Sequence, residues 1–291
     1  MYGQIAAIIA PIFICSGLGF GWARLRRPFD TGFVTSLITV VGTPCLVAST
    51  LTRLHVSPVA MGEIAGAAAL VFAGAAATGM IALRAMRLPL HSYLPAVMFP
   101  NAGNMGLPLC LFAFGDRGLA LAIVYFALAS TLQFTAGATI AAGRLNLGRL
   151  LSMPLLYALA VSFVFLATGT PVPPWLANTI QLIGGLTIPL MLIALGVSLA
   201  RLRISSFRRS VVLSMLRIGG GAAIGAGVGW ALGLDGTARG VLVIQSAMPV
   251  AVFNYLFAQL YKRAPEEVAG MIVLSTLLSF ATLPVLLLLV L

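Results

Sequence analysis

The chain has 291 residues, of which 60% are hydrophobic and only 8% charged, and its formal net charge is +11. Soluble globular domains carry roughly 25% charged residues, so this composition excludes a soluble protein and indicates that lipid surrounds most of the chain. The positive charge is spread thinly over short joints between apolar stretches, which excludes the concentrated basic surface of a nucleic-acid-binding protein.

Ten apolar stretches follow one another, each close to the length of about 20 residues that a helix needs to cross a bilayer. Barrel strands alternate in polarity over about ten residues, whereas these stretches are apolar throughout. The sequence therefore predicts an all-α, multi-pass protein of the inner or plasma membrane. We expect the first stretch to be a retained helix, because no basic leader or cleavage site precedes it. The ten stretches cover residues 2–22, 33–52, 61–83, 91–113, 117–141, 150–169, 175–199, 210–233, 238–260 and 268–290.

Basic residues predict the orientation of these helices, because cytoplasmic joints are rich in Lys and Arg. The alternate joints beginning with the second carry only Arg53, Arg117 and Arg239. We therefore expect the odd-numbered joints to be cytoplasmic and both termini to lie outside. The basic residues of the odd-numbered joints are Arg24, Arg26, Arg27, Arg84, Arg87, Arg144, Arg149, Arg201, Arg203, Arg208, Arg209, Lys262 and Arg263.

Six prolines inside the stretches indicate an internal repeat. They form three pairs, namely Pro11 with Pro154, Pro44 with Pro189, and Pro100 with Pro249. The members of each pair are about 145 residues apart, so five helices are followed by five more on the same plan. Because five is odd, we expect an inverted-topology 5+5 repeat. Prolines are common in membrane helices, so a chance match is the alternative.

The fourth stretch carries helix-breaking and polar residues near its centre. Two Pro, two Asn and two Gly lie between Pro100 and Pro108. Proline removes a backbone donor, glycine lets the backbone open, and an Asn side chain in hydrocarbon needs a hydrogen-bond partner. This pattern predicts a broken helix.

The ninth stretch has a similar cluster around Pro249, with Gln245, Ala251 and Asn254 nearby. Both breaks are expected roughly 13–15 Å from the interface, about halfway through a 30 Å hydrocarbon core. Since the two helices run in opposite directions, we expect them to cross near the midplane.

The second half of each broken helix begins with N–H groups that lack partners and carry partial positive charge. Two such ends facing a cavity form an anion site, to which Asn side chains can add donors. Unwound backbone in a bilayer is tolerated where it lines a cavity. The alternative is a pair of packing kinks in which Gly103 and Gly106 permit close helix contact. The predicted substrate-binding residues are Pro100, Asn101, Gly103, Asn104, Gln245, Pro249, Ala251 and Asn254.

The segment Phe99–Leu109 resembles the fourth-helix motif of the auxin efflux carrier family, and the segment from Ala247 to Ala258 is similar to its ninth-helix motif. The resemblance covers the ten stretches, the repeat and the outward termini. It implies a crossover fold marked by Pro100 and Pro249, with Asn101 as a polar substrate contact. At Ala251 this chain lacks an amide, and the long cytoplasmic loop of the plant carriers is missing.

The same resemblance implies two domains and a mechanism. Residues 1–52 and 150–199 would form a scaffold that dimerises, and residues 61–141 and 210–291 would form a moving transport domain. The movement would be elevator-like alternating access. The implied substrates are auxin, malate or malonate.

Other polar or kinked positions each have two interpretations. Arg217 lies inside a stretch, where its side chain would either snorkel to the cytoplasmic interface or contact an entering anion. Gln133, with Thr131 and Thr135, would line the cavity or bond neighbouring helices. Pro44 and Pro189 would bend the cavity wall or be ordinary kinks.

No enzyme, metal or cofactor site is predicted. Cys15, Cys45 and Cys110 lie inside apolar stretches without paired spacing. His55 and His91 lie near interfaces, and every Asp and Glu lies in a joint or at the end of a stretch. A nucleophile–base pair or a metal-ligand set is therefore not expected.

The predicted function is transport of small organic carboxylate anions, by export or uniport. Proton-coupled carriers usually bury a carboxylate or His, whereas a monoanion leaving a negative cytoplasm gains about 2.3 kcal/mol per 100 mV. Malonate, malate, a branched-chain acid and an aromatic acid are all open as substrates. A sodium-coupled symporter of the bile-acid class is the alternative, although its sodium sites would be expected to include acidic ligands near the crossing.

Overall fold

The structure is a computed structural model that describes residues 2–53, 57–143, 153–202, 204–234 and 236–291. His55, Arg144, Arg149 and Arg203 lie outside the described residues. The described chain is all-helical and contains no strand. Its α-helices and π-helices (η) are α1 (Tyr2–Arg24), α2 (Thr31–Leu37), η1 (Ile38–Gly42), α3 (Thr43–Arg53), α4 (Pro58–Ala85), α5 (Leu90–Met98), η2 (Ala102–Gly106), α6 (Leu107–Leu132), η3 (Gln133–Gly137), α7 (Ala138–Ala142), α9 (Pro154–Thr168), α10 (Pro174–Arg201), α11 (Phe207–Ala231), α12 (Gly236–Ser246), α13 (Phe253–Leu260) and α14 (Pro265–Val290).

Seven helical stretches of the described chain are long and apolar enough to cross a membrane, so this is a multi-pass membrane protein. The number differs from ten because two predicted stretches are broken, one is merged with its neighbour, and α9 is a shorter apolar helix. The helices α5, α12 and α13 are too short to cross alone. The residues from Ala102 to Ala142 form one long helical stretch, which is interrupted by Gly115 at φ 65° and ψ −158°. The count of ten is therefore still a prediction.

Local chemistry sets several helix starts. The Asp30 side chain caps α2 by accepting a hydrogen bond from the Phe33 N–H at 2.9 Å. Ser57 caps α4 in the same way, with 3.2 Å between the Ala60 nitrogen and Ser57 Oγ, and Pro58 follows in the first turn. These residues satisfy backbone donors that a helix N-terminus leaves free.

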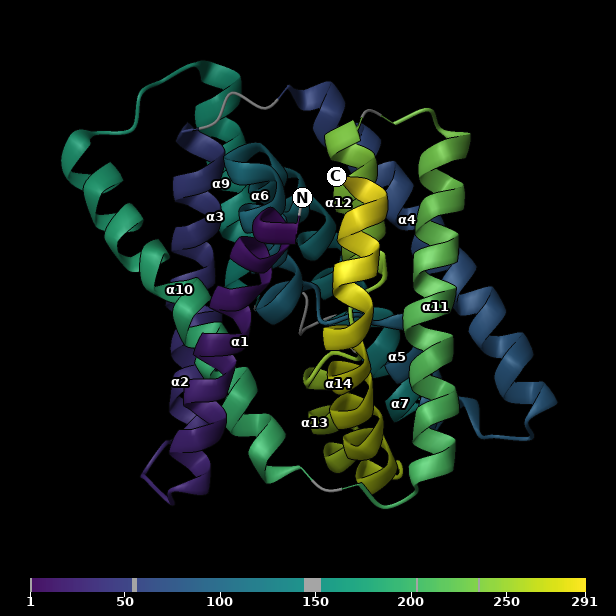
Figure 1. Ribbon diagram of the computed structural model, residues 1–291. Coiled ribbons are helices and arrows are strands. Elements are labelled where there is room, and N and C mark those ends of the chain that lie inside the picture. Colours follow the sequence, from purple (N-terminus) through teal and green to yellow (C-terminus); the bar gives the residue numbers. More distant parts are fainter. Residues whose placement is uncertain (1, 54–56, 144–152, 203, 235) are drawn as a thin grey trace.

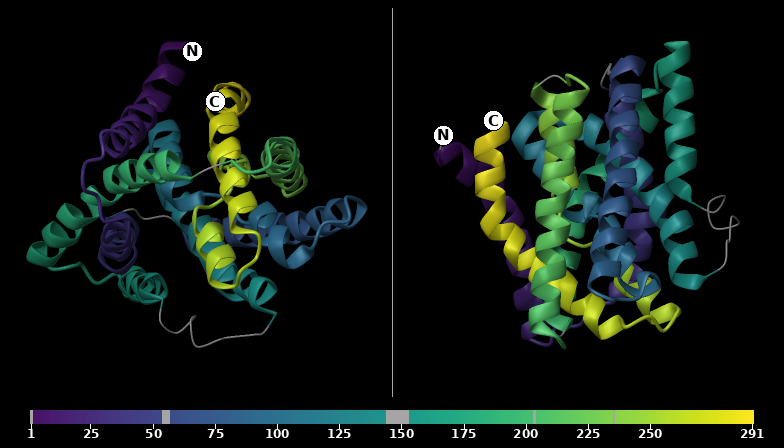
Figure 2. Two further views of the ribbon diagram at one scale, coloured as in Figure 1. Left: turned by 90° about the horizontal axis from the view of Figure 1, so that it is seen from below. Right: turned by 90° about the vertical axis from the view of Figure 1, so that its right-hand side faces the viewer.

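The helices form two groups. In Figures 1 and 2, α1, α3, α9 and α10 lie on one side, and α4, α11, α12 and α14 lie on the other. Within the first group α1 packs along α10, and within the second α11 packs against α12, α14 and α4. The contact of α1 with α10 is close because Gly196 lies against the Ser16 carbonyl, where a Cβ would overlap backbone atoms.

Most of the basic joints lie at one end of the molecule. The joints between α1 and α2, α4 and α5, α10 and α11, and α13 and α14 are all at the lower end in Figure 1. The C-terminal ends of α3 and α11 lie at the opposite end. The uneven distribution of Lys and Arg in the sequence is therefore also an uneven distribution in space.

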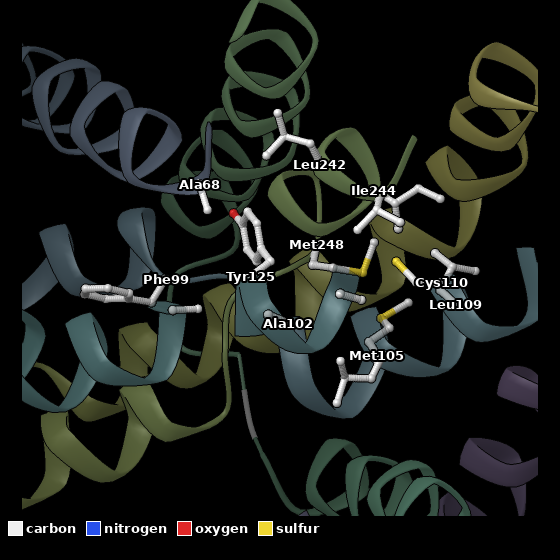
Figure 3. Close-up of a cluster of buried hydrophobic side chains, with 14 of the residues drawn as sticks. Ala68, Phe99, Ala102, Met105, Leu109, Cys110, Tyr125, Leu242, Ile244 and Met248 are labelled. Atoms are coloured by element: carbon white, nitrogen blue, oxygen red, sulfur yellow. The ribbon is translucent and has the colours of Figure 1, made fainter. Parts of the chain in front are cut away.

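The largest hydrophobic core cluster surrounds the helix interruptions. Phe99, Ala102, Met105, Tyr125 and Met248 are each at most 2% exposed (Figure 3). The irregular backbone between α5 and η2 and between α12 and α13 is thereby buried in protein, which is the condition under which a membrane protein tolerates it.

Candidate functional site

Two helices are interrupted at the predicted prolines, and the interrupted segments pair with each other. The Asn101 N–H donates to the Pro249 carbonyl at 2.7 Å, and the Ala251 N–H donates to the Phe99 carbonyl at 3.1 Å. Pro100 and Val250 thus form an isolated antiparallel bridge. This pairing, which we call the crossing bridge, satisfies backbone N–H and C=O groups that lose their helical partners at the breaks.

A cavity of about 360 Å³ lies beside the crossing bridge. Its walls come from α2, η1, α3, α9 and α10 on one side and from η2, α6, η3 and α13 on the other. The second wall adjoins the second group of helices, because α6 packs against α4 and α12, and α13 packs against α14. None of its lining residues is charged. They are Thr35, Ile38, Thr39, Val40, Thr43, Pro100, Asn101, Ala102, Gly103, Asn104, Phe126, Ala129, Ser130, Gln133, Phe134, Met153, Pro154, Leu155, Met191, Ala194, Ala251, Val252 and Phe253.

All three π-helices of the described chain contribute to this cavity. Two of them have a proline two residues after their last residue, Pro44 after η1 and Pro108 after η2. Because proline has no N–H, it gives no helical hydrogen bond to the carbonyl four residues earlier, which belongs to Val40 or Asn104. Both of these residues line the cavity. Such π-segments are frequent at functional sites.

Asn101 is the most informative side chain of the cavity. It is only 4% exposed, and its Nδ2 atom is buried without a hydrogen-bond partner. A buried amide donor without a partner costs about 1–3 kcal/mol. Asn101 lies at the start of η2, where helix N–H groups without intrahelical partners carry partial positive charge. This corner of the cavity therefore offers donors to a ligand with acceptor atoms.

Half-buried Asn104 lies one turn further along η2. Of the other predicted site residues, Pro100, Gly103, Ala251 and Gln133 also line the cavity.

Asn254 does not line the cavity but supports its wall. Its Nδ2 donates to the Phe99 carbonyl at 3.3 Å, and its Oδ1 accepts from Gln133 Nε2 at 3.1 Å. The two amides therefore tie η3 and α13 to the crossing bridge.

The remaining predicted residues lie away from the cavity. Pro249 belongs to the crossing bridge, and Gln245 is completely buried against Gly106, with 3.5 Å between its Nε2 atom and the Ala122 carbonyl. Pro44 and Pro189 lie within α3 and α10 and do not line the cavity.

Sequence reasoning missed one polar wall. Thr35, Thr39 and Thr43 all line the cavity from the second predicted helix. Their spacing of four residues places them on one face of a helix. A polar stripe of this kind on an apolar stretch was the signal that could have found them. Ser130, on α6, was missed as well.

Neither interpretation of Arg217 is correct. Its side chain is 2% exposed, so it does not snorkel, and it does not line the cavity. The guanidinium instead donates to the carbonyls of Val97 at 2.8 Å and Met98 at 2.9 Å, and also to the carbonyl of Ser246. These carbonyls are at the C-terminal ends of α5 and α12.

Comparison with known proteins gives the family. The chain is 29% identical over 197 residues to an uncharacterized transporter of Methanothermobacter thermautotrophicus, which covers 65% of this chain and 64% of the relative. It is 25% identical over 194 residues to an uncharacterized transporter of Methanocaldococcus jannaschii, with 62% of each chain covered. The matches thus span less than two thirds of either relative. A family model described as a membrane transport protein matches residues 138–287, just over half of the chain. This protein therefore belongs to the membrane transport protein family, the auxin efflux carrier family whose motifs its two interrupted helices resemble.

Proposed function

We propose that this protein carries small organic carboxylate anions across the cell membrane, as an exporter or uniporter. The observation that carries the proposal is the unpartnered, buried amide donor of Asn101 at the cavity wall. A carboxylate supplies acceptor oxygens that would satisfy this donor together with the free N–H groups of the η2 start. A hydrogen bond to a charged acceptor contributes about 1.5–3 kcal/mol, enough to hold a ligand in place.

The size and lining of the cavity support a small organic anion. Its volume of about 360 Å³ is at the lower end of the roughly 300–1,000 Å³ that small-molecule sites occupy. Phe126, Phe134 and Met191 offer an apolar surface for the body of the ligand. Because the lining carries no charged side chain, the attraction for an anion would come from backbone dipoles, each equivalent to about half a positive charge.

The proposed architecture has ten transmembrane helices in a 5+5 inverted repeat, with interrupted crossover helices at the fourth and ninth positions. The match between Pro100 and Pro249 supports the repeat, because both prolines are in the crossing bridge. The first proline pair supports it less, since Pro11 lies inside α1 whereas Pro154 begins α9.

The proposed movement is elevator-like. The scaffold would comprise residues 1–52 and 150–199, and the transport domain residues 61–141 and 210–291. The position of the cavity between the two groups of helices supports this division, because a relative displacement of the groups would change access to the cavity. We further propose a homodimer formed through the scaffold, cytoplasmic odd-numbered joints, and both termini outside.

The cavity extends from the crossing bridge toward the end that carries most of the basic joints. Its lining includes Thr35, which lies one turn into α2, and α2 starts at that end. If the basic end is cytoplasmic, as the distribution of Lys and Arg predicts, the cavity would open inward in this conformation.

The test is thermal stabilisation of the purified protein by malonate, malate and indole-3-acetate, each measured in sodium chloride and in choline chloride. A carboxylate that raises the melting temperature equally in both salts, while its uncharged amide does not, would support the proposal. Stabilisation that appears only with sodium would favour the sodium-coupled symporter of the bile-acid class. If no carboxylate of a wider panel raises the melting temperature, the proposed substrate class is refuted.

A further inference from the structure

A buried arginine joins the C-terminal ends of both interrupted helices. Arg217, on α11, reaches two carbonyls at the end of α5 and one at the end of α12. No carboxylate of the described residues pairs with it, and the ion pair between Arg209 and Glu267 lies two turns away along α11. The partners of this buried cation are therefore backbone carbonyls.

The sequence of α11 builds this contact. Arg217, Gly221 and Gly225 are spaced by four residues and therefore share one face of the helix. A Cβ at Gly221 would overlap the Ser246 carbonyl, and a Cβ at Gly225 would overlap the Ser246 side chain. The absence of side chains at these two positions lets the end of α12 approach α11 closely enough for the guanidinium to bind its carbonyl.

The charges at this point balance. Each helix C-terminus is equivalent to about −0.5 elementary charge, so the ends of α5 and α12 together present about −1. The guanidinium of Arg217 supplies +1. In transporters with interrupted helices, half-helix C-termini and unwound carbonyls are common ligands of a bound sodium ion or proton. Here a side chain of the protein occupies that position.

We infer that Arg217 is a tethered counter-cation, which makes an inorganic cation unnecessary at the crossing. It neutralises the C-terminal ends of α5 and α12, and neither Arg217 nor the carbonyl-bearing residues that it contacts line the cavity. The partial positive charge at the N-terminal ends of η2 and α13 then has no counter-charge at the cavity. The effect on anion binding rests on the proposed function, whereas the replacement of a free cation does not.

The experiment compares the wild type with Arg217→Ala, Arg217→Gln and Arg217→Lys. Arg208→Gln is the matched control, because Arg208 is exposed on the same helix. Melting temperatures are measured in choline chloride, sodium chloride and dilute guanidinium chloride at matched ionic strength. We expect the wild type and the control to have equal melting temperatures in the three salts. Arg217→Ala should melt lower in choline, and sodium or guanidinium should restore part of the loss by filling the vacated carbonyl site.

The Gln and Lys variants separate the effect of charge from that of hydrogen bonding. If the Ala variant does not fold, they still test whether Arg217 acts as a counter-cation. Gln can donate to carbonyls without a charge, whereas Lys keeps the charge. We expect Lys to retain affinity for the stabilising carboxylate and Gln to lose about two- to thirtyfold of it. Equal behaviour of Gln and Lys, or a sodium requirement of the wild type, would overturn the inference. If no carboxylate stabilises even the wild type, the proposed function fails, while the cation response of the Arg217 variants still tests the counter-cation.

Discussion

Replacement of Asn101 by alanine should affect folding and binding in opposite directions. In the free protein its Nδ2 is buried without a partner, so removal of the amide takes away an unsatisfied group worth about 1–3 kcal/mol. With a carboxylate bound, the same amide would make a hydrogen bond to a charged acceptor, worth about 1.5–3 kcal/mol. At 1.4 kcal/mol per tenfold change, we expect the carboxylate to bind about 10- to 150-fold more weakly. The backbone bond from Asn101 to Pro249 is independent of the side chain and should persist.

The assay is a thermal-shift titration of purified Asn101→Ala with the best carboxylate of the panel, followed by flux in proteoliposomes. The free variant should melt at the wild-type temperature or above it, and its dissociation constant and flux should both be impaired. Asn178→Ala is the control, because Asn178 is exposed on α10 away from the cavity. An unchanged dissociation constant in a folded Asn101→Ala protein would remove Asn101 from the site and refute the reasoning.

Three further results are expected. Gly221→Ala should destabilise the fold by about 1–3 kcal/mol through overpacking against Ser246. The control Gly219→Ala, with open space around its Cβ, should stabilise the fold by about 0.5–1 kcal/mol. Equal melting temperatures of the two variants would contradict the close approach of α11 and α12. Glu267→Gln removes an ion pair with Arg209, whose side chain is 41% exposed, so denaturant titration should reveal only a small loss of stability. A large loss would mean that the pair is structurally essential. Proteoliposomes held at 100 mV should accumulate a monoanionic substrate about 50-fold at equilibrium. A substrate concentration gradient that does not change with the membrane potential would exclude uniport.

The sequence was sufficient to predict the interruptions but not their pairing. Pro100 and Pro249 mark the breaks, because proline is incompatible with a continuous helix at these positions. That the Asn101 N–H pairs with the Pro249 carbonyl depends on the relative height and rotation of two helices, which local residue chemistry does not determine. For the same reason Gln245, close to a break along the chain, turned out to face Ala122 rather than the cavity.

Prediction was weakest for residues whose partners are distant in the sequence. Arg217 was expected at an interface or near an anion because a membrane-buried cation usually needs water or a negative charge. Its partners are the carbonyls of Val97, Met98 and Ser246, and carbonyls are present at every residue and leave no mark in a sequence. The threonine stripe from Thr35 to Thr43 did leave a mark, because its four-residue spacing can be read from the sequence.

The crossing bridge also imposes an order on the assembly of this protein during its synthesis. The two segments that form it are about 150 residues apart, which at 5–20 residues per second corresponds to roughly 8–30 s of translation. The end of α5 lacks Arg217 for the first 120 or so of these residues, and the start of η2 lacks the Pro249 segment throughout the interval. Each unsatisfied backbone group costs several kcal/mol in hydrocarbon. The nascent N-terminal half is therefore expected to wait beside the insertion machinery, or with water at its break, until the C-terminal half arrives.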